Sequence, residues 1–172
     1  MNHDSYSEAY IRDILTGSKV FAIAGASANP VRPSYFVLKY LKAKGYEVIP
    51  VNPGQAGNTI AGLKVYASLK DIPGSVDVVD IFRNSKLALE TTREAIEIGA
   101  KVVWMQLGVR NDEAARLAEA AGLKVVMNRC PKIEYGRLSG EIGWAGVHTR
   151  TLSSQRAVLG PAGFQKLSIG KR

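Results

Sequence analysis

The sequence predicts an α/β protein, a Rossmann-like three-layer αβα domain built on a five-stranded parallel sheet. Short apolar runs alternate along the chain with segments of helical periodicity. The apolar runs are rich in small and β-branched residues and end in loop residues, which is typical of strands buried on both faces. Parallel strands need crossover connections, and the intervening helices supply them. The alternation therefore indicates a doubly wound fold.

The candidate strands are "KVFAIAG", "YEVIPV", "VDVVDIF", "KVVWMQ" and "LKVVMN". A helix over about residues 6–16 precedes the first of them, because "SYSE" forms a capping box and Gly17 is a stop signal. Pro33 fits the first turn of a second helix, which ends at Gly45. The region 54–75 is expected to be irregular, with a short helix near residues 68–71.

Two further helices complete the pattern. Ser85 or Asn84 caps one helix, and Gly99 ends it. Asn111 caps "DEAARLAEAA", whose alanines and leucine form one apolar face, and Gly122 ends that helix.

The domain is expected to span residues 1–138, including the helix within 5–16, and residues 139–172 form a basic C-terminal extension. Trp144 and Val147 are suited to pack this extension onto the domain or onto a second subunit. An exposed edge of the parallel sheet is another surface that would support a homodimer.

The composition is that of an ordinary globular protein of 172 residues, 46% hydrophobic and 22% charged. No apolar run approaches the roughly 18 residues of a membrane span, and the polar, acidic start lacks a signal-peptide pattern. The single cysteine, Cys130, cannot form an internal disulfide, which favours a cytoplasmic location. The histidines, His3 and His148, are far apart, so no metal site is expected.

The net charge of +8 raises the question of nucleic acid as a partner. No acidic residue follows Glu141, and the extension carries the positive charges Arg150, Arg156, Lys166, Lys171 and Arg172. A basic tail of this kind is typical of a solvated terminus, so nucleic-acid binding is a minority interpretation.

Ligands of doubly wound sheets bind at the carboxyl ends of the strands, at the topological switch point. The segments that reach this edge are "GAS", "VNP", "FRNS", "QLG" and "NRCP". The first contains small residues that let a ligand approach the backbone closely, namely Gly25, Ala26 and Ser27. After Pro33, the N–H groups of Ser34 and Tyr35 are expected to be free, where the helix dipole favours an anion. Arg32 either contacts a phosphate or points into solvent.

The second strand end argues against a nicotinamide cofactor. Dinucleotide-binding folds usually place an acidic residue there for the ribose hydroxyls, whereas this chain has Asn52, and the later glycines of the fingerprint are missing. At the third end, Phe82 and Arg83 suit an adenine and a phosphate, although Phe82 fits a core position equally well. At the fourth strand end, Gln106 offers a polar group, and Gly108 offers a position where a ligand can approach the backbone closely.

Cys130 follows the fifth strand. It is either an inert buried residue or a ligand contact, and a nucleophilic role would need an activating base. The sequence shows no Ser/His/Asp order, no Walker A motif and no recognisable pair of carboxylates, so no catalytic residue is predicted and the protein is not expected to be an enzyme.

Taken together, "GASANPVRPSY", "GYEVIPVNP", "VDVVDIFRNS", "WMQLGVRN" and "VVMNRCPKIEYGRL" resemble the CoA-binding protein family, small relatives of the CoA-binding domain of the succinyl-CoA synthetase α subunit. The resemblance covers about residues 20–138. It implies that the first loop and the following helix hold the CoA phosphates. The positions that match the family's binding segments are Gly25, Ala26, Ser27, Arg32, Pro33, Ser34, Asn52, Pro53, Phe82, Arg83, Ser85, Gln106 and Gly108. The ligase's later domain, with its phosphorylated histidine, is missing, so ligase chemistry is not implied.

The leading hypothesis is a protein that binds coenzyme A or acyl-CoA through its phosphates and adenine, without catalysis of its own. The alternative is an NAD(P)-dependent oxidoreductase or redox-sensing nucleotide-binding protein, in which Arg32 takes the 2′-phosphate of NADP. A third hypothesis is a mixed disulfide between Cys130 and the CoA thiol. The acyl group and the physiological process stay open.

Overall fold

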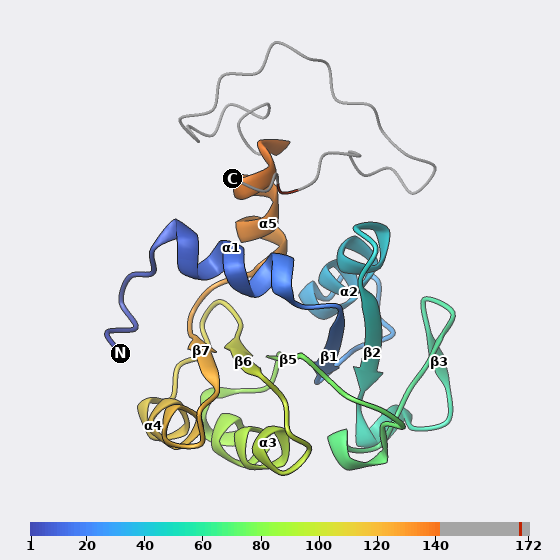
Figure 1. The fold of residues 1–172 in the computed structure, drawn as a ribbon. Coiled ribbons are helices and arrows are strands. Elements are labelled where there is room, and N and C mark those ends of the chain that lie inside the picture. The colour runs from blue at the N-terminus through green and yellow to red at the C-terminus, as the bar shows by residue number, and fades with distance from the viewer. Residues whose placement is uncertain (142–168, 170–172) are drawn as a thin grey trace.

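A sheet lies between two layers of helices in the computed structural model, which describes residues 1–141 and residue 169 (Figure 1). The strands of the sheet are β1 (Val20–Ala24), β2 (Glu47–Val51), β5 (Val78–Ile81), β6 (Val102–Met105) and β7 (Lys124–Val126). They pair in the order β2-β1-β5-β6-β7, and every pair is parallel. The predicted five-stranded parallel sheet and Rossmann-like α/β class are therefore confirmed.

The helices divide between the two faces of this sheet. The helices are α1 (Glu8–Gly17), α2 (Pro33–Ala43), α3 (Ser85–Glu97), α4 (Asp112–Ala120) and α5 (Pro131–Ser139). Buried residues of α3 and α4 belong to the hydrophobic cluster on one face, and those of α1, α2 and α5 belong to the cluster on the other. This is the three-layer arrangement expected for right-handed crossovers.

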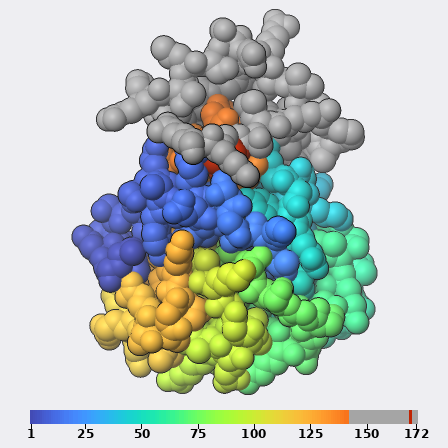
Figure 2. Space-filling model, in the orientation of Figure 1, coloured from blue at the N-terminus to red at the C-terminus, as the bar shows by residue number. Residues whose placement is uncertain are grey.

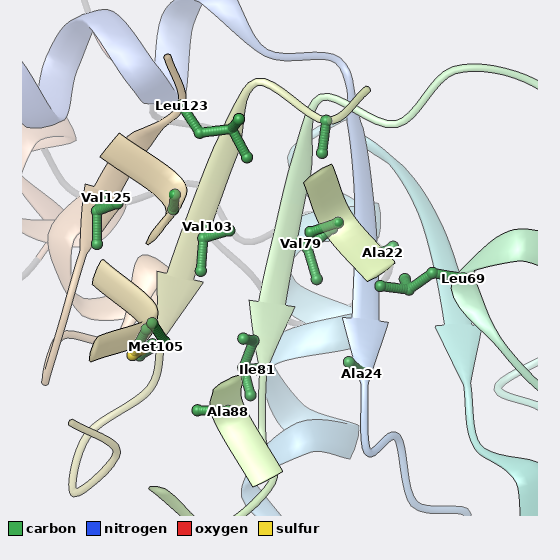
Figure 3. Close-up of a cluster of buried hydrophobic side chains, with 14 of the residues drawn as sticks. Ala22, Ala24, Leu69, Val79, Ile81, Ala88, Val103, Met105, Leu123 and Val125 are labelled. Carbon is green, nitrogen blue, oxygen red and sulfur yellow. The ribbon is translucent and has the colours of Figure 1, made fainter. Parts of the chain in front are cut away.

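Alternate residues of each strand supply the two clusters. Ala22 and Ala24 of β1 face α3 and α4, whereas Phe21 and Ile23 face the other layer. Figure 3 shows the first cluster, in which labelled side chains from four strands of the sheet point to the same face. Burial on both faces explains why these strands appear in the sequence as continuous apolar runs rather than alternating ones.

The first helix begins later than the sequence pattern indicates. The capping box "SYSE" predicts a start near residue 6, but Ser7 is the N-cap, and its side chain accepts a hydrogen bond from the Tyr10 N–H. Ser5 and Ser7 are equally good capping residues by type, so the sequence alone does not choose between them.

The region between β2 and β5 contains more regular structure than expected. The predicted short helix is present as η2 (Leu69–Asp71), and η1 (Pro53–Gln55) follows β2. Strands β3 (Thr59–Ile60) and β4 (Leu63–Lys64) form an antiparallel hairpin that the sequence did not indicate. The helix α5 was also not predicted, and it extends one residue past the predicted domain boundary at 138. The expected roles of Trp144 and Val147 lie outside the described residues.

Residues of the same chain cover the β7 edge and the carboxyl end of the β2 edge. On β7, the Val125 N–H donates to the Tyr10 hydroxyl at 3.0 Å, and the Met127 N–H just after the strand donates to the Tyr6 hydroxyl at 2.7 Å. The space-filling view shows the N-terminal segment beside this part of the chain (Figure 2). On β2, Tyr66 bonds the Pro50 carbonyl and the Asn52 N–H. An exposed edge suitable for a homodimer is thus limited to the rest of β2, and the oligomeric state stays a prediction.

We expect the two tyrosine hydroxyls to stabilise the β7 edge. Replacing Tyr6 or Tyr10 with Phe leaves a backbone N–H unpaired at a part-buried position, and each change should lower the free energy of unfolding by about 1–2 kcal/mol. Urea unfolding measures this. Tyr66→Phe is the matched control, because its hydroxyl makes no hydrogen bond within the described residues. Equal effects of all three changes would contradict the edge-capping role.

Candidate functional site

The direction in which the chain adds strands to the sheet reverses between β1 and β5. The chain leaves β1 for β2 on one side and later returns to β5 on the other, so the loops after β1 and β5 separate at their carboxyl ends. A cavity of about 540 Å³ lies there. It is lined by Gly25, Ala26, Ser27, Arg32, Pro33, Ser34, Val37, Asn52, Phe82, Gln106, Leu107, Val109 and Cys130.

The loop after β1 is held in place by its own polar groups. The Ser27 N–H donates to the Ser34 hydroxyl at 3.1 Å, and the Asn29 N–H donates to the Ser27 hydroxyl at 3.2 Å. Gly25 has a φ of +90°, a conformation that other residues rarely adopt. A Cβ atom there would lie 3.2 Å from Arg83 Cγ and 3.3 Å from the Phe82 carbonyl carbon. Gly25 is therefore required both by the turn and by the close approach of the next loop.

The N-terminus of α2 faces this cavity, as predicted, but it offers fewer free donors than expected. Pro33 occupies the first turn, and Arg32 is the N-cap without a side-chain capping bond. The Tyr35 N–H donates to the Arg32 carbonyl at 3.1 Å, which corrects the expectation that it is free. The Ser34 N–H has no partner among the described residues. One amide, the helix dipole and the exposed Arg32 guanidinium thus favour an anion at this position.

Asn52 lines the cavity and also braces its wall. Its amide nitrogen donates to the Ala26 carbonyl at 2.7 Å, and its amide oxygen accepts from the Gly54 N–H at 2.9 Å. The side chain therefore fixes the first loop to the segment after β2. The absence of an acidic residue at this strand end keeps that part of the cavity free of negative charge.

Some of the predicted site residues lie beside the cavity rather than in its lining: Pro53, Arg83, Ser85 and Gly108. The Ser85 hydroxyl accepts from the Arg110 N–H, and the Gly108 N–H donates to Asn128, so both hold loops together. Asn84, and not Ser85, caps α3 through a bond from the Leu87 N–H. A direct ligand contact by these residues stays a prediction.

A group of buried polar side chains forms another part of the cavity wall. Gln106, only 5% exposed, directs its amide nitrogen toward Asp80 Oδ2 at 3.4 Å and Cys130 Sγ at 3.8 Å. Its amide oxygen accepts from the Leu107 N–H, which fixes the orientation of the carboxamide. Asp80 lies between Ile23 and Trp104 of the neighbouring strands and is fully buried.

Burial determines the protonation of this group. Loss of hydration raises the pKa of Asp80 well above its ordinary value, and the hydrogen bond from Gln106 opposes that shift only in part. Burial also raises the pKa of the Cys130 thiol. Both shifts therefore favour the neutral form of the group.

A second cavity of about 540 Å³ lies at the opposite end of the sheet. Gly17, Gly99 and Gly122, at the C-terminal ends of three helices, form part of its lining. Helix C-termini carry partial negative charge and disfavour anions. The cavity at the carboxyl ends is therefore the better candidate for a phosphate-bearing ligand.

Sequence reasoning did not single out Val37, Leu107, Val109 or Asp80. Val37 lies one turn after Pro33, so its place on the helix could have indicated the cavity. Leu107 and Val109 belong to the loop after β6 and carry no distinctive pattern. Asp80 could have been found, because a charged residue within the apolar run "VDVVDIF" has no ordinary place in a strand buried on both faces.

Comparison with known proteins identifies the family to which these features belong. Residues 19–136 match the CoA binding domain family. The chain belongs to this family. The matched range contains every strand of the central sheet and the complete lining of the cavity at the carboxyl ends.

Individual relatives agree with this assignment. The chain is similar to the uncharacterized protein YneT of Bacillus subtilis, with 39% identity over 75% of this chain and 94% of that protein. It is 30% identical to the α subunit of an ADP-forming acetate–CoA ligase II from Pyrococcus furiosus, covering 69% of this chain but only 28% of the subunit. A solved hypothetical protein from Pyrococcus horikoshii OT3 has a TM-score of 0.75 and 44% identity, over 80% of this chain and 96% of that one.

Within residues 1–141 and residue 169, no group of three or more His, Cys, Asp or Glu side chains is arranged to hold a metal ion. None of the helices in that part of the chain has the length and hydropathy needed to span a bilayer.

Gly25→Ala should destabilise the protein through both strain and crowding. A left-handed residue costs about 1–2 kcal/mol, and the new methyl group would also press on the loop that holds Phe82 and Arg83. Gly57→Ala is the matched control, with a φ of +83° and no atom within 4 Å of the added Cβ. Urea unfolding should show a larger loss for Gly25. Equal losses would mean that the close approach is unimportant.

Asp80→Asn should change how stability depends on pH. Because the folded pKa of Asp80 lies above the unfolded value of about 3.9, the native state holds a proton that the unfolded chain releases. The Asp80 contribution to the free energy of unfolding therefore falls as pH rises, by about 1.4 kcal/mol per unit between the two pKa values. The Asn variant lacks this contribution and should gain stability over the wild type with rising pH. Parallel curves of the free energy of unfolding against pH for the variant and the wild type would show that Asp80 is ionised in the folded protein.

Proposed function

We propose that this protein binds coenzyme A or an acyl-CoA in the cavity at the carboxyl ends of its strands, without catalysing a reaction. The observation that carries the proposal is the placement of the α2 N-terminus, Arg32 and the Ser27–Ser34 pair on one cavity wall. Membership of the CoA binding domain family and similarity to an acetate–CoA ligase subunit support the choice of ligand.

The cavity offers different chemistry to different parts of such a ligand. The N–H of Ser34 at the N-terminus of α2 and the Arg32 guanidinium suit the phosphates, because both favour anions without needing a metal ion. Phe82, half-buried in the lining, is available to pack against the adenine ring. The lining also contains an apolar surface beside Gln106, formed by Val37, Leu107 and Val109. This surface suits the uncharged remainder of the ligand.

A nicotinamide dinucleotide fits less well. Asn52 stands where an acidic residue would bind the ribose, and its carboxamide is already bonded to Ala26 and Gly54. The NAD(P) alternative is nonetheless testable in the same experiment as CoA. We further propose a cytoplasmic location, on the composition and the single cysteine.

The test is the thermal midpoint of the purified protein with CoA, acetyl-CoA, NAD, NADPH or ATP at equal concentration and with reductant present. A ligand at 100 times its dissociation constant stabilises the native state by about 2.7 kcal/mol, which raises the midpoint by several degrees. We expect this rise with CoA and acetyl-CoA. A larger rise with NADPH, or none with CoA, would reject the proposal.

The substitution Arg32→Ala tests whether the cavity wall that contains Arg32 binds the phosphates. The loss of a charge-assisted contact to phosphate should weaken CoA binding about tenfold or more. Arg116→Ala is the control, because Arg116 is exposed on α4, which covers the other face of the sheet. Titration calorimetry measures both affinities. An unchanged affinity in Arg32→Ala would place the phosphates elsewhere.

A further inference from the structure

The sulfur of Cys130 lies in the wall of the candidate site, where β7 leads into α5. Cys130 is 8% exposed, and it belongs to the cavity lining. The cavity is therefore the side from which a reagent would approach this residue. The anion-binding wall at Ser27 and Ser34 belongs to the same cavity, so a ligand with a phosphate at one end and sulfur at the other can contact both walls.

Three groups around the sulfur favour its negatively charged form, whereas burial and the charge of Asp80 oppose it and raise the pKa of Cys130. Cys130 is the N-cap residue of α5, and the N–H groups of Ile133 and Lys132 face the sulfur closely enough to lower its pKa, although they form no regular capping bond. The Gln106 amide nitrogen approaches it at 3.8 Å. Helix N-termini and amide donors of this kind stabilise thiolates. Burial outweighs them in the resting protein, so the thiolate is a minor, accessible form.

The buried side chain of Asp80 is an independent observation that points to a role of this wall beyond core packing. Its side chain is fully buried, Oδ2 meets the same Gln106 nitrogen as the Cys130 sulfur, and Oδ1 has no hydrogen-bond partner within the described residues. Such a group is costly in an apolar layer. Burial raises the pKa of this carboxyl and so favours its neutral form, which matters because a charge on Asp80 raises the pKa of the Cys130 thiol.

We propose that the Cys130 thiol undergoes thiol–disulfide exchange with the disulfide form of a CoA-type ligand. The ligand is then held in the cavity as a mixed disulfide with Cys130. The Cys130 thiolate attacks one sulfur of the ligand disulfide, a new sulfur–sulfur bond forms and the original one breaks. The departing thiolate takes up the proton that Cys130 released, so one reduced thiol leaves. The ligand disulfide is the oxidant, and no other co-reactant is needed. This inference rests on the proposed function.

The experiment uses the full chain, freed of reductant, with CoA disulfide or with hydroxyethyl disulfide at the same concentration. Intact mass spectrometry follows the adduct over time. Since Cys130 is the single cysteine, the site of any disulfide adduct is unambiguous. We expect a mass gain of one CoA less two hydrogen atoms, formed at least about tenfold faster than the hydroxyethyl adduct, because binding places the disulfide beside the sulfur. Dithiothreitol should reverse it.

Cys130→Ser is the control for non-covalent carry-over and should show no adduct. Serine is a preferred N-cap residue, so the variant is expected to fold. Stabilisation by reduced CoA in the wild type is measured in parallel. If reduced CoA stabilises the protein but CoA disulfide reacts no faster than hydroxyethyl disulfide, the inference fails and the proposed function stands. If reduced CoA gives no stabilisation, the proposed function fails, and equal rates with both disulfides would reject the inference as well.

Discussion

The parallel pairing of β1 with β2 on one side and with β5 on the other is the constraint on which the candidate site depends. It brings Ala24 level with Val51 and with Ile81, so three strand ends lie in register. The loops that follow must diverge, because one connection leads to each side of the sheet. The Gly25 and Ala26 N–H groups bond the Val51 carbonyl, and the Phe82 N–H bonds the Ala24 carbonyl, which fixes the loops to the sheet. The cavity is the space that this divergence leaves.

Burial of Asp80 conflicts with the requirement for an apolar layer between the sheet and α2. Strand geometry places its side chain between Ile23 and Trp104, away from water. Burial raises the pKa of the carboxyl, which favours its neutral form, and Gln106 is its one weak hydrogen-bond partner among the described residues. The same carboxamide reaches Cys130, so a polar group that lowers the stability of the core also organises the cavity wall. Costs of this kind are commonly found where a protein binds or reacts.

Much of the fold could be predicted, because buried parallel strands and their helices have strong sequence patterns. The apolar run ending at Gly25 and the proline that begins α2 identified both the first strand and the loop that lines the cavity. The hairpin of β3 and β4 could not be predicted, since strands of two residues are too short for any periodicity. The helix α5 could not be predicted from periodicity, because it is only weakly amphipathic and its place depends on tertiary contacts. Glu141, just after it, pairs with Lys44 and accepts a bond from Tyr40.

The titratable groups that face the cavity limit what the site can do. Among the described residues of its lining, Arg32 and Cys130 are the ones with ionisable side chains, and a guanidinium serves to bind anions. The described histidine, His3, bonds Tyr6 and faces Glu119 at the β7 edge, away from the cavity lining. General acid–base chemistry therefore has no evident carrier within the described part of the site. Anion binding needs none, and thiol–disulfide exchange needs only a sulfur whose thiolate is accessible. The lining is thus suited to holding a ligand, by contact or by a reversible bond.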